Sequence, residues 1–193
     1  MAIPKRAAAI AVLIALAASG CTQPDPNAKP TYACTPSEGG TPHPCYKAEH
    51  DLQAKEDALY AEAEAVYRKY RTEHERIYRV GGAKQATPTM LETLTGDALQ
   101  ERTAHYRGLL ESSVRATGGT FLLGYLRRAP KEKAEGSIAT LESCIDARSV
   151  RITEGKTSHP GKIGLERAFF TQSDSGLKIS YLMRFDGEVA SCV

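Results

Sequence analysis

Five cysteines in a chain of 193 residues are the first residues of this sequence that could do chemistry. A cysteine sulfur can form a disulfide, ligate a metal, act as a nucleophile or carry a lipid, and its surroundings decide between these roles. The sequence around each cysteine therefore indicates its role. The five are Cys21, Cys34, Cys45, Cys144 and Cys192.

Cys21 directly follows a segment that is typical of an exported protein. Lys5 and Arg6 precede an apolar run over residues 7–18, which is too short to span a bilayer of about 30 Å but has the length of a signal-peptide core. The tetrapeptide at 18–21, Ala-Ser-Gly-Cys, resembles a bacterial lipobox, with alanine where leucine is usual. We expect cleavage before Cys21 and acylation of its sulfur, which would hold the chain at a membrane. The alternative is a plain secreted protein in which this cysteine has no special role.

The composition divides the chain into three parts. Residues 1–20 are the expected lipoprotein signal peptide, residues 21–47 are rich in proline, threonine and glycine, and residues 48–193 have regular apolar patterns. A proline-rich stretch with few apolar residues has little to bury and is typical of a flexible spacer. We therefore expect a lipidated spacer that carries a folded domain at the outer face of the cytoplasmic membrane.

The four remaining cysteines are an even number in a chain expected to be exported, which indicates two disulfides. Cys34 and Cys45 are close together in the spacer, whereas Cys144 and Cys192 lie in strand-like segments. We therefore favour the pairs 34–45 and 144–192 among the three connectivities. The rival is a zinc site, but its spacing matches no usual zinc finger, and we expect neither a metal nor a cofactor. Its ligands would be Cys34, His43, Cys45 and His50.

The charge balance argues against one class of partner. The chain has 25 Lys and Arg residues against 23 Asp and Glu residues, and Lys5 and Arg6 of the signal segment account for the difference. A nucleic-acid-binding protein needs a clear basic excess, so no nucleic-acid partner is expected. The sequence also contains no G-x-S-x-G elbow, Walker-type loop or HExxH motif, which are signatures of common hydrolase, nucleotidase and metallopeptidase sites.

The apolar periodicity predicts helices first and strands afterwards. Residues 48–80 repeat apolar side chains at steps of three, four and seven, which predicts one long helix. Shorter helices are expected after Pro88 and after Thr95 or Asp97. Beyond Ser113 the period changes to two, which predicts an antiparallel sheet and an α+β fold. The expected strands lie within 119–128, 136–146, 148–155, 163–172 and 176–185, with a short final strand before Cys192.

The pattern also predicts two local features, a bulge in one strand and an inward stripe on the long helix. Leu141 and Cys144 are three positions apart in an otherwise alternating segment, which predicts a bulge there. The long helix should turn one stripe of side chains inward. That stripe consists of Leu52, Leu59, Ala63, Val66, Tyr70 and Ile77, widened by Tyr60, Tyr67 and Tyr78.

The order of elements over residues 48–193, with the phrases "LTGDAL", "SCID", "EGK" and "SDSGLKIS", resembles a nuclear transport factor 2-like (SnoaL-like, cystatin-like) domain. More narrowly, it resembles secreted and lipidated actinobacterial members of that fold. Leu177 stands where a tryptophan is more usual. The resemblance implies an α+β cone, in which a long N-terminal helix and one or two shorter helices pack on a curved antiparallel sheet. Dimers are frequent in that fold, so a homodimer is left open.

Enzymes of that superfamily place an Asp, Tyr or His side chain in a pocket at the open end of the cone. The resemblance implies Tyr106, Tyr125 and Asp146 as candidate pocket residues, with His105 beside them. Each has a structural alternative: Asp146 can form a turn after a strand, and Tyr106 belongs to the apolar face of its helix. No paired-carboxylate or His–Asp spacing stands out, so no catalytic residue is assigned and a non-enzymatic role is favoured.

Three functions are compatible with these observations. We favour a lipoprotein whose domain binds a protein or another component of the cell envelope without catalysing a reaction. The second is a binder or enzyme of small molecules that uses the cone pocket. The third is a prophage-borne lipoprotein that blocks superinfection by a second phage. In all three, the N-terminal lipid holds the chain at the membrane.

Overall fold

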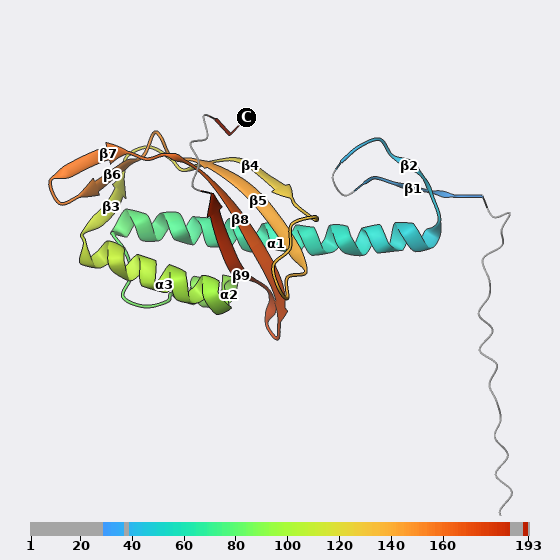
Figure 1. Cartoon of the computed structure of the whole chain (residues 1–193), viewed down its shortest axis with the longest axis horizontal. Coiled ribbons are helices and arrows are strands. Elements are labelled where there is room, and N and C mark those ends of the chain that lie inside the picture. The colour runs from blue at the N-terminus through green and yellow to red at the C-terminus, as the bar shows by residue number, and fades with distance from the viewer. Residues whose placement is uncertain (1–28, 37–38, 186–190, 193) are drawn as a thin grey trace, which may run out of the picture.

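A computed structural model describes residues 29–36, 39–185 and 191–192, so Cys21 and the expected signal peptide lie outside the described residues. The fold is α+β, as predicted. Three helices lie on one side of a curved antiparallel sheet (Figure 1). A second, smaller sheet covers one end of this arrangement, and a two-stranded hairpin stands at the other end (Figure 1).

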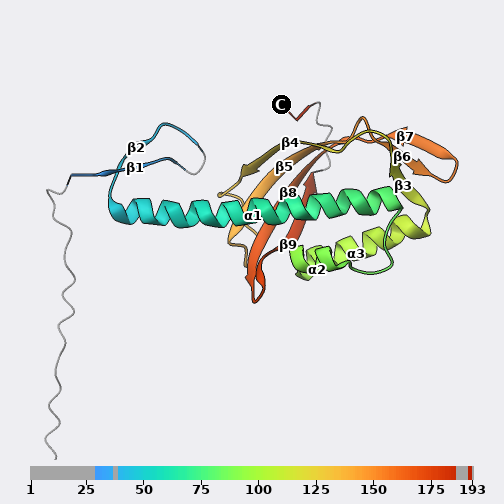
Figure 2. The same ribbon diagram turned by 180° about the vertical axis from the view of Figure 1, so that it is seen from behind.

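The long predicted helix is α1 (Lys47–Val80), and it ends at Gly81, whose φ of 85° is a left-handed conformation that suits glycine. Leu52 is 68 % exposed, so the prediction that it belongs to the inward stripe is wrong. The reason is that the first turns of α1 extend beyond the sheet, where nothing from the sheet covers them (Figure 2). The buried side chains of α1 are Tyr60, Ala63, Tyr67, Tyr70, Glu73, His74 and Ile77.

Part of the expected flexible spacer is folded. β1 (Tyr32–Cys34) and β2 (His43–Cys45) pair antiparallel, and a disulfide joins their cysteines, whose Cα atoms are 5.8 Å apart. The Thr35 backbone N–H donates a hydrogen bond to Gln53 Oε1 at 3.0 Å, and Gln53 Nε2 donates one to the Thr35 carbonyl at 2.5 Å. The spacer has few apolar residues, so the disulfide and these hydrogen bonds to α1 hold the hairpin in place of a hydrophobic core.

The two shorter helices are α2 (Pro88–Thr93) and α3 (Gly96–Glu111). The Thr87 side chain accepts a hydrogen bond from the first turn of α2, where proline is tolerated because its missing N–H has no helical partner. The Thr95 backbone N–H donates to the Ile179 carbonyl at 2.9 Å. This bond fixes the start of α3 against the last strand of the main sheet.

The main sheet has four antiparallel strands in the order β4-β5-β8-β9, and the smaller sheet has three in the order β3-β6-β7. The predicted strands correspond to β4, β5, β6, β8 and β9. β3 and β7 were not among them, because the alternation of β3 covers only four residues and β7 has no apolar alternation. The final strand expected before Cys192 falls mostly on residues outside the described ones. The bounds are β3 (Val114–Thr117), β4 (Leu122–Arg128), β5 (Ala139–Asp146), β6 (Arg151–Glu154), β7 (Thr157–Pro160), β8 (Ile163–Ser173) and β9 (Gly176–Phe185).

Strand β5 is buried on both faces, which explains its irregular pattern in the sequence. Leu141 packs in the core with the helices, and Glu142 points to the opposite side, where side chains of β4 and β8 cover it. The bulge predicted in this segment is wrong, because β5 pairs with β8 without any register shift. The irregularities lie instead in β4 at Gly124 and in β9 at Ser180.

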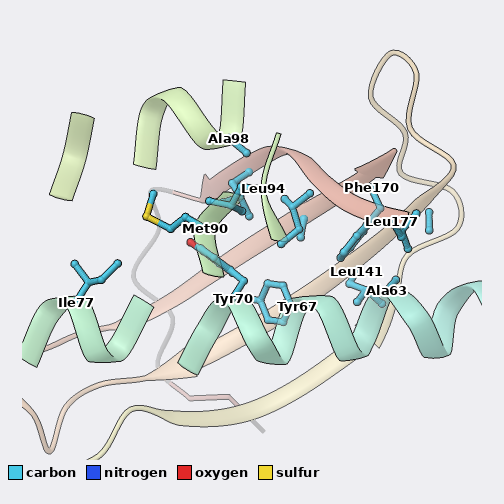
Figure 3. Packing of buried hydrophobic residues seen from close by; sticks show 14 of the residues in the cluster. Ala63, Tyr67, Tyr70, Ile77, Met90, Leu94, Ala98, Leu141, Phe170 and Leu177 are labelled. Carbon is cyan, nitrogen blue, oxygen red and sulfur yellow. The ribbon is translucent and has the colours of Figure 1, made fainter. Parts of the chain in front are cut away.

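The main core fills the space between the three helices and the inner face of the main sheet. Tyr67 and Tyr70 of α1 pack there with Leu141 and Phe170 of the sheet (Figure 3). Leu177, where the resemblance leads one to expect tryptophan, is 3 % exposed and belongs to this core. The domain is thus organised around α1, with the sheet curved over it.

The second disulfide joins Cys144 of β5 to Cys192, and their Cα atoms are 5.5 Å apart. A Cβ atom on Gly124 would lie 2.3 Å from Cys192 Cβ, so glycine at the β4 bulge leaves room for this bridge. Both pairings favoured from the sequence, 34–45 and 144–192, are present. Two disulfides indicate an oxidising, extracytoplasmic setting.

Candidate functional site

The structure separates the residues that the sequence suggested as one pocket. Asp146, at the end of β5, accepts hydrogen bonds from the Arg148 backbone N–H at 3.0 Å and from Arg148 Nη2 at 2.6 Å. These bonds lower the pKa of Asp146. Asp146 therefore forms the turn after its strand, which is the structural alternative considered from the sequence. Tyr106 is buried between α1 and α3, whereas Tyr125 lies on the other side of the main sheet.

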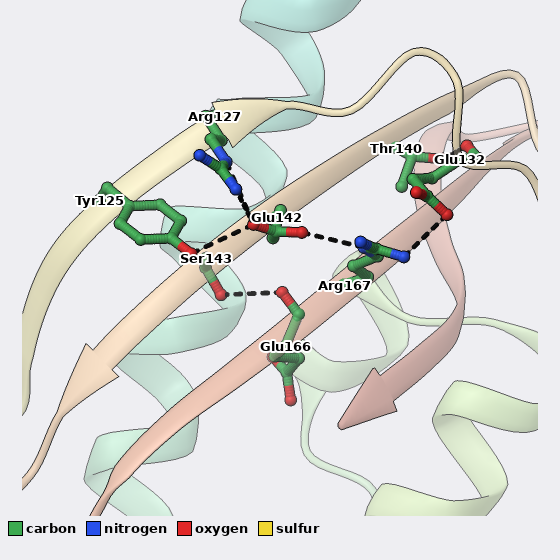
Figure 4. Close-up of polar contacts among 8 residues, drawn as sticks. All are labelled: Tyr125, Arg127, Glu132, Thr140, Glu142, Ser143, Glu166 and Arg167. Carbon is green, nitrogen blue, oxygen red and sulfur yellow. Dashed lines mark hydrogen bonds and ion pairs between the residues drawn. The ribbon is translucent and has the colours of Figure 1, made fainter. Parts of the chain in front are cut away.

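Tyr125 belongs to a group of polar residues on the face of the main sheet away from the helices, which we call the outer-face cluster. At its centre, Glu142 accepts hydrogen bonds from the Tyr125 hydroxyl at 3.1 Å, from Arg127 Nη2 at 2.5 Å and from Arg167 Nε at 3.0 Å (Figure 4). Arg167 Nη1 also pairs with Glu132 at 2.7 Å. The cluster consists of Tyr125, Arg127, Glu132, Glu142 and Arg167.

The outer-face cluster borders an open depression of about 540 Å³, but its charges already neutralise one another. Burial acts to raise the pKa of Glu142, and the hydrogen bonds from Arg127, Arg167 and Tyr125 outweigh it, so that the pKa is lowered. Every charged group of the cluster has an ion-pair partner within it. We conclude that the cluster mainly holds β4, β5 and β8 together.

A second cavity, of about 510 Å³, lies between the C-terminal half of α1, the ends of β8 and β9, and the smaller sheet. We call it the helix–sheet cavity. Its wall contains the buried side chains of His74 and Glu166, and its rim contains the exposed residues His159 and Lys162. Most of the remaining wall is apolar. The apolar side chains are Leu109, Val114, Phe121, Ile145, Ala147, Ile152, Leu165 and Phe185.

Among the described residues that line this cavity, Glu166 is the single acidic one. Tyr67 donates a hydrogen bond to Glu166 Oε1 at 3.1 Å. Arg102 Nη2 and Arg184 Nε each lie 3.6 Å from Glu166 Oε2. Arg102 is 6 % exposed, and its Nε atom has no hydrogen-bond partner among the described residues. The Glu166 carboxylate is therefore the ion-pair partner of two guanidinium groups.

A third guanidinium, that of Arg71, also faces the helix–sheet cavity. Arg71 is partly buried, and the described residues offer it no hydrogen bond and no ion pair within 4.0 Å. It borders a smaller cavity of about 210 Å³ as well, which shares Phe121 and Ile145 with the larger one. Because Glu166 is already bonded to other groups, the positive charge of Arg71 has no counterpart of its own.

Two histidine–tyrosine pairs lie beside these arginines. His74 Nδ1 is 2.6 Å from the Tyr106 hydroxyl, and His105 Nε2 is 2.7 Å from the Tyr78 hydroxyl. Burial, reinforced by the nearby arginines, lowers the pKa of His74 well below its ordinary value and that of His105 to about 4. Burial also raises the pKa of Tyr106. Both histidines are therefore neutral at neutral pH.

These shifts limit the acid–base chemistry of His74, which lines the cavity, and of its partner Tyr106. A neutral histidine with a strongly lowered pKa is a weak proton acceptor, and a buried tyrosine with a raised pKa is a weak proton donor. Among the described residues that line the cavity there is no Ser, Thr or Cys nucleophile. The arrangement is suited to holding a molecule between apolar walls and fixed charges, and poorly suited to moving protons.

The zinc site considered from the sequence is not compatible with the hairpin. Cys34, Cys45 and Glu49 lie close enough together to suggest a metal site, but the two sulfurs are joined in a disulfide and cannot act as thiolate ligands. His43 Nε2 instead contacts Glu49 Oε1 at 3.2 Å. The group is explained by the structure of the hairpin.

The charged residues in and beside the cavity were not among the sequence candidates, although Arg102 and Glu166 leave a signal in the sequence. Arg102 falls between Leu99 and Tyr106 on the apolar side of a predicted helix. Glu166 lies on the same face of its strand as Ala168 and Phe170, because residues two positions apart share a face. Both of those residues are buried. A charged residue at a position that the period assigns to the interior is the signal that could have identified them.

Comparisons with known proteins add little to this description. No family model matches the chain, and no curated protein matches it. One structure that resembles it is the crystal structure of the intermembrane space region of the chloroplast protein ARC6, with 17 % sequence identity. That likeness covers 63 % of this chain and 92 % of the other, with a TM-score of 0.47. Among the described residues, none of the helices has the length and hydropathy needed to span a membrane.

Proposed function

We propose that this protein is a lipid-anchored extracytoplasmic binding protein, whose domain holds a small molecule in the helix–sheet cavity without transforming it. The observation that carries the proposal is the cavity itself, which has a volume of about 510 Å³, mostly apolar walls, a buried carboxylate at Glu166 and the arginine side chains of Arg71 and Arg184. Small-molecule sites commonly enclose about 300–1,000 Å³, with a mostly apolar lining and a few polar groups that orient the ligand.

Binding is favoured over catalysis by the state of the polar groups. The Glu166 carboxylate is held by Tyr67 and lies between two arginines. His74 and Tyr106 are hydrogen-bonded to each other, and their pKa values are shifted away from neutrality. General acid–base catalysis at neutral pH works best with groups whose pKa lies near 7, and the pKa values of His74 and Tyr106 are shifted away from it.

The extracytoplasmic position is supported by the two disulfides, and the anchor is supported by the sequence before Cys21. Tyr32, where the hairpin begins, follows Cys21 by eleven positions. A fully extended chain spans at most about 3.6 Å per residue, so this linker reaches about 40 Å. An acylated Cys21 would therefore keep the hairpin close to the membrane surface and leave the cavity free in the surrounding solution.

We further propose that the domain belongs to the nuclear transport factor 2-like class. The order of a long helix, two shorter helices and a curved antiparallel sheet supports this assignment. In that class a pocket at the open end of the cone is the usual place for a ligand. The presence of the helix–sheet cavity between α1 and the ends of β8 and β9 supports the same proposal.

The anchor can be tested by labelling cells with a radioactive palmitate. We expect label in the wild-type protein and none in the Cys21→Ser variant, with globomycin causing the unprocessed form to accumulate. Cys144→Ser is the matched control, because it removes another cysteine and leaves the lipobox intact. If Cys21→Ser is labelled and processed as the wild type is, the anchor is refuted.

The binding role can be tested by native mass spectrometry of the full chain extracted gently from its own cells. We expect a bound small molecule, and we expect Ile152→Trp to remove it, because the larger ring fills the cavity that Ile152 lines. Leu122→Trp is the control, since Leu122 is 55 % exposed and lies outside the cavity wall. An empty wild-type protein, or a ligand that Ile152→Trp retains, would contradict the proposal.

A further inference from the structure

The geometry points to an amphipathic organic anion as the ligand of the helix–sheet cavity, with a carboxylate or phosphate group bound at Arg71 and an apolar body against the wall. This inference rests on the proposed function, because it names the chemical class that the proposed site takes. It is carried by three observations on charge, on hydrogen bonding and on the surface of the wall.

The first observation is an excess of positive charge. Arg71 and Arg184 line the cavity, Arg102 reaches the same carboxylate from α3, and Glu166 is the single acidic group that faces them among the described wall residues. Lys162 adds a further cation at the rim. Like charges held close together in a partly buried place repel one another. An anion bound between them would relieve this repulsion, whereas a cationic ligand would increase it.

The second observation is the unmet hydrogen-bonding capacity of the guanidinium groups. Arg71, in the cavity wall, has no hydrogen bond or ion pair within the described part of the chain. Arg102 is not part of that wall, but it reaches Glu166 of the wall, and its buried Nε atom has no partner either. A guanidinium offers five N–H donors in a planar fork that matches the two oxygens of a carboxylate or phosphate. Such bidentate bonds are among the strongest that a protein forms.

The third observation is the wall. Phe121, Ile152 and Phe185 contribute apolar surface to the same cavity that Arg71 and Arg184 enter. A small inorganic anion would leave this surface wet, and a purely apolar molecule would leave the guanidinium of Arg71 unpaired. A molecule that has an anionic group and an apolar body satisfies both parts of the wall.

The outer-face cluster shows what an arginine-rich group looks like when it is complete. There, Arg127 and Arg167 each have an acidic partner at 2.5–3.0 Å, and Glu142 receives bonds on both of its oxygens. In the helix–sheet cavity, the closest distances from the arginines to Glu166 are 3.6 Å. The difference in pairing singles out the cavity as the place for an external anion.

The inference can be tested with two matched fluorescent probes. 8-Anilinonaphthalene-1-sulfonate and N-phenyl-1-naphthylamine share one aromatic skeleton, and only the first carries an anionic group. We would titrate both into the full chain carrying Cys21→Ser, so that neither acyl groups nor detergent compete for the probe. The variants are Arg71→Gln, Arg71→Lys and Ile152→Trp, with Arg115→Gln as the control, because Arg115 is exposed and outside this cavity.

We expect the anionic probe to bind at least tenfold more tightly than the neutral one. Arg71→Gln should weaken the anionic probe about tenfold and change the neutral probe less than twofold, Arg71→Lys should recover part of the loss, and Arg115→Gln should change neither. Raising the salt concentration should weaken only the anionic probe, because salt screens charge interactions. This last measurement uses the unsubstituted cavity and stands even if Arg71→Gln fails to fold.

Two other outcomes would overturn the inference, and they differ in what they leave standing. If both probes bind with equal affinity, insensitive to Arg71→Gln and to salt, but Ile152→Trp abolishes both, the cavity binds apolar molecules and only the anion preference is wrong. If Ile152→Trp changes neither probe, the probes bind elsewhere, and the proposed function of the cavity fails as well. If the anionic probe is preferred, competition with octanoate and octyl phosphate shows whether the cavity prefers a carboxylate or a phosphate. Octanol, which carries no charge, is expected to displace the anionic probe only weakly.

Discussion

Arg102 of α3 and Glu166 of β8 lie 3.6 Å apart, from Nη2 to Oε2, and their side chains are only 8 % and 5 % exposed. Arg184 of β9 approaches the same carboxylate oxygen, also at 3.6 Å. Glu166 is thus the buried anion that joins a helix to the main sheet and offsets two arginines. The same group forms part of the wall of the helix–sheet cavity, so the stability of the domain and its capacity to bind are linked at this residue.

Glu166→Gln is expected to destabilise the protein strongly. It removes the charge that compensates Arg102 and Arg184, and breaking a buried ion pair by removing one partner typically costs about 3–5 kcal/mol. Urea denaturation of the variant checks this value. Glu154→Gln is the control, since Glu154 is exposed on β6, and it should lie within about 0.5 kcal/mol of the wild type. Equal effects of the two substitutions would show that Glu166 is not an essential counter-ion.

The two disulfides are expected to contribute differently to stability. Cys144 and Cys192 are 48 positions apart, so in the loop-entropy model their bridge contributes about 4 kcal/mol. Cys34 and Cys45 are 11 positions apart and give about 3 kcal/mol, which acts on the hairpin outside the main core. The double variant Cys144→Ala/Cys192→Ala should therefore lower the Tm of the domain clearly more than Cys34→Ala/Cys45→Ala does. The reverse order in calorimetry would contradict this assignment.

The stability of the domain is expected to fall as the pH is lowered from about 6.5 to 4. Burial lowers the pKa of His105 to about 4, and His74 is shifted in the same direction. Between the folded and the ordinary pKa, the unfolded chain binds more protons than the folded one. The full stability is therefore present above about pH 6.5, is lost progressively down to pH 4, and loses nothing more from His105 below that.

Urea midpoints at pH 7, 6, 5 and 4 measure this slope. His105→Gln should make the decline shallower, because residue 105 then binds no proton in either state, while the Tyr78 hydroxyl retains a polar neighbour. His159→Gln, on the exposed rim, is the control and should keep the wild-type slope. A His105→Gln protein with an unchanged slope would show that His105 is not buried in its neutral form.

Two glycines near α3 should respond in opposite directions to alanine. A Cβ atom on Gly82 would lie 2.4 Å from the Tyr106 carbonyl oxygen, and its φ of 109° is unfavourable for alanine. Gly108, inside α3, has nothing within 4 Å of such an atom. We expect Gly82→Ala to destabilise by about 1–3 kcal/mol and Gly108→Ala to stabilise by up to about 1 kcal/mol. Thermal unfolding of both variants tests whether α1 and α3 meet as closely as described.

Periodicity predicted the elements that have long, regular patterns and missed those that do not. The helix over Lys47–Val80 and the strands β8 and β9 follow from apolar steps that cover many residues. The alternation of β3 covers only four residues and β7 has none, so their pairing with β6 is what identifies them as strands. Leu52 was assigned to the wrong surface because a period shows which face of a helix is apolar, and not how far the neighbouring sheet extends.

The candidate site was predicted less well than the fold. Tyr125 and Asp146 belong to the same strand pair, β4 and β5, but each is bonded to its own neighbours, Glu142 and Arg148. Tyr106 does lie near the cavity, bonded to His74, yet its burial and raised pKa leave it a packing role. Residue type alone does not show whether a polar side chain already has a partner.

What the sequence by itself determined is the α+β order of elements, the length of α1 and, through cysteine number and spacing, the two disulfides. The element order and the length of α1 follow from local apolar patterns, and the disulfides follow from the number and positions of the cysteines. The tertiary structure decided which charges meet. Arg71, Arg102, Glu166 and Arg184 come from α1, α3, β8 and β9. Only the packing of those elements brings Arg102 and Arg184 to Glu166 and places Arg71 in the wall of the same cavity. A periodic pattern places a side chain on a face but does not show what lies opposite it.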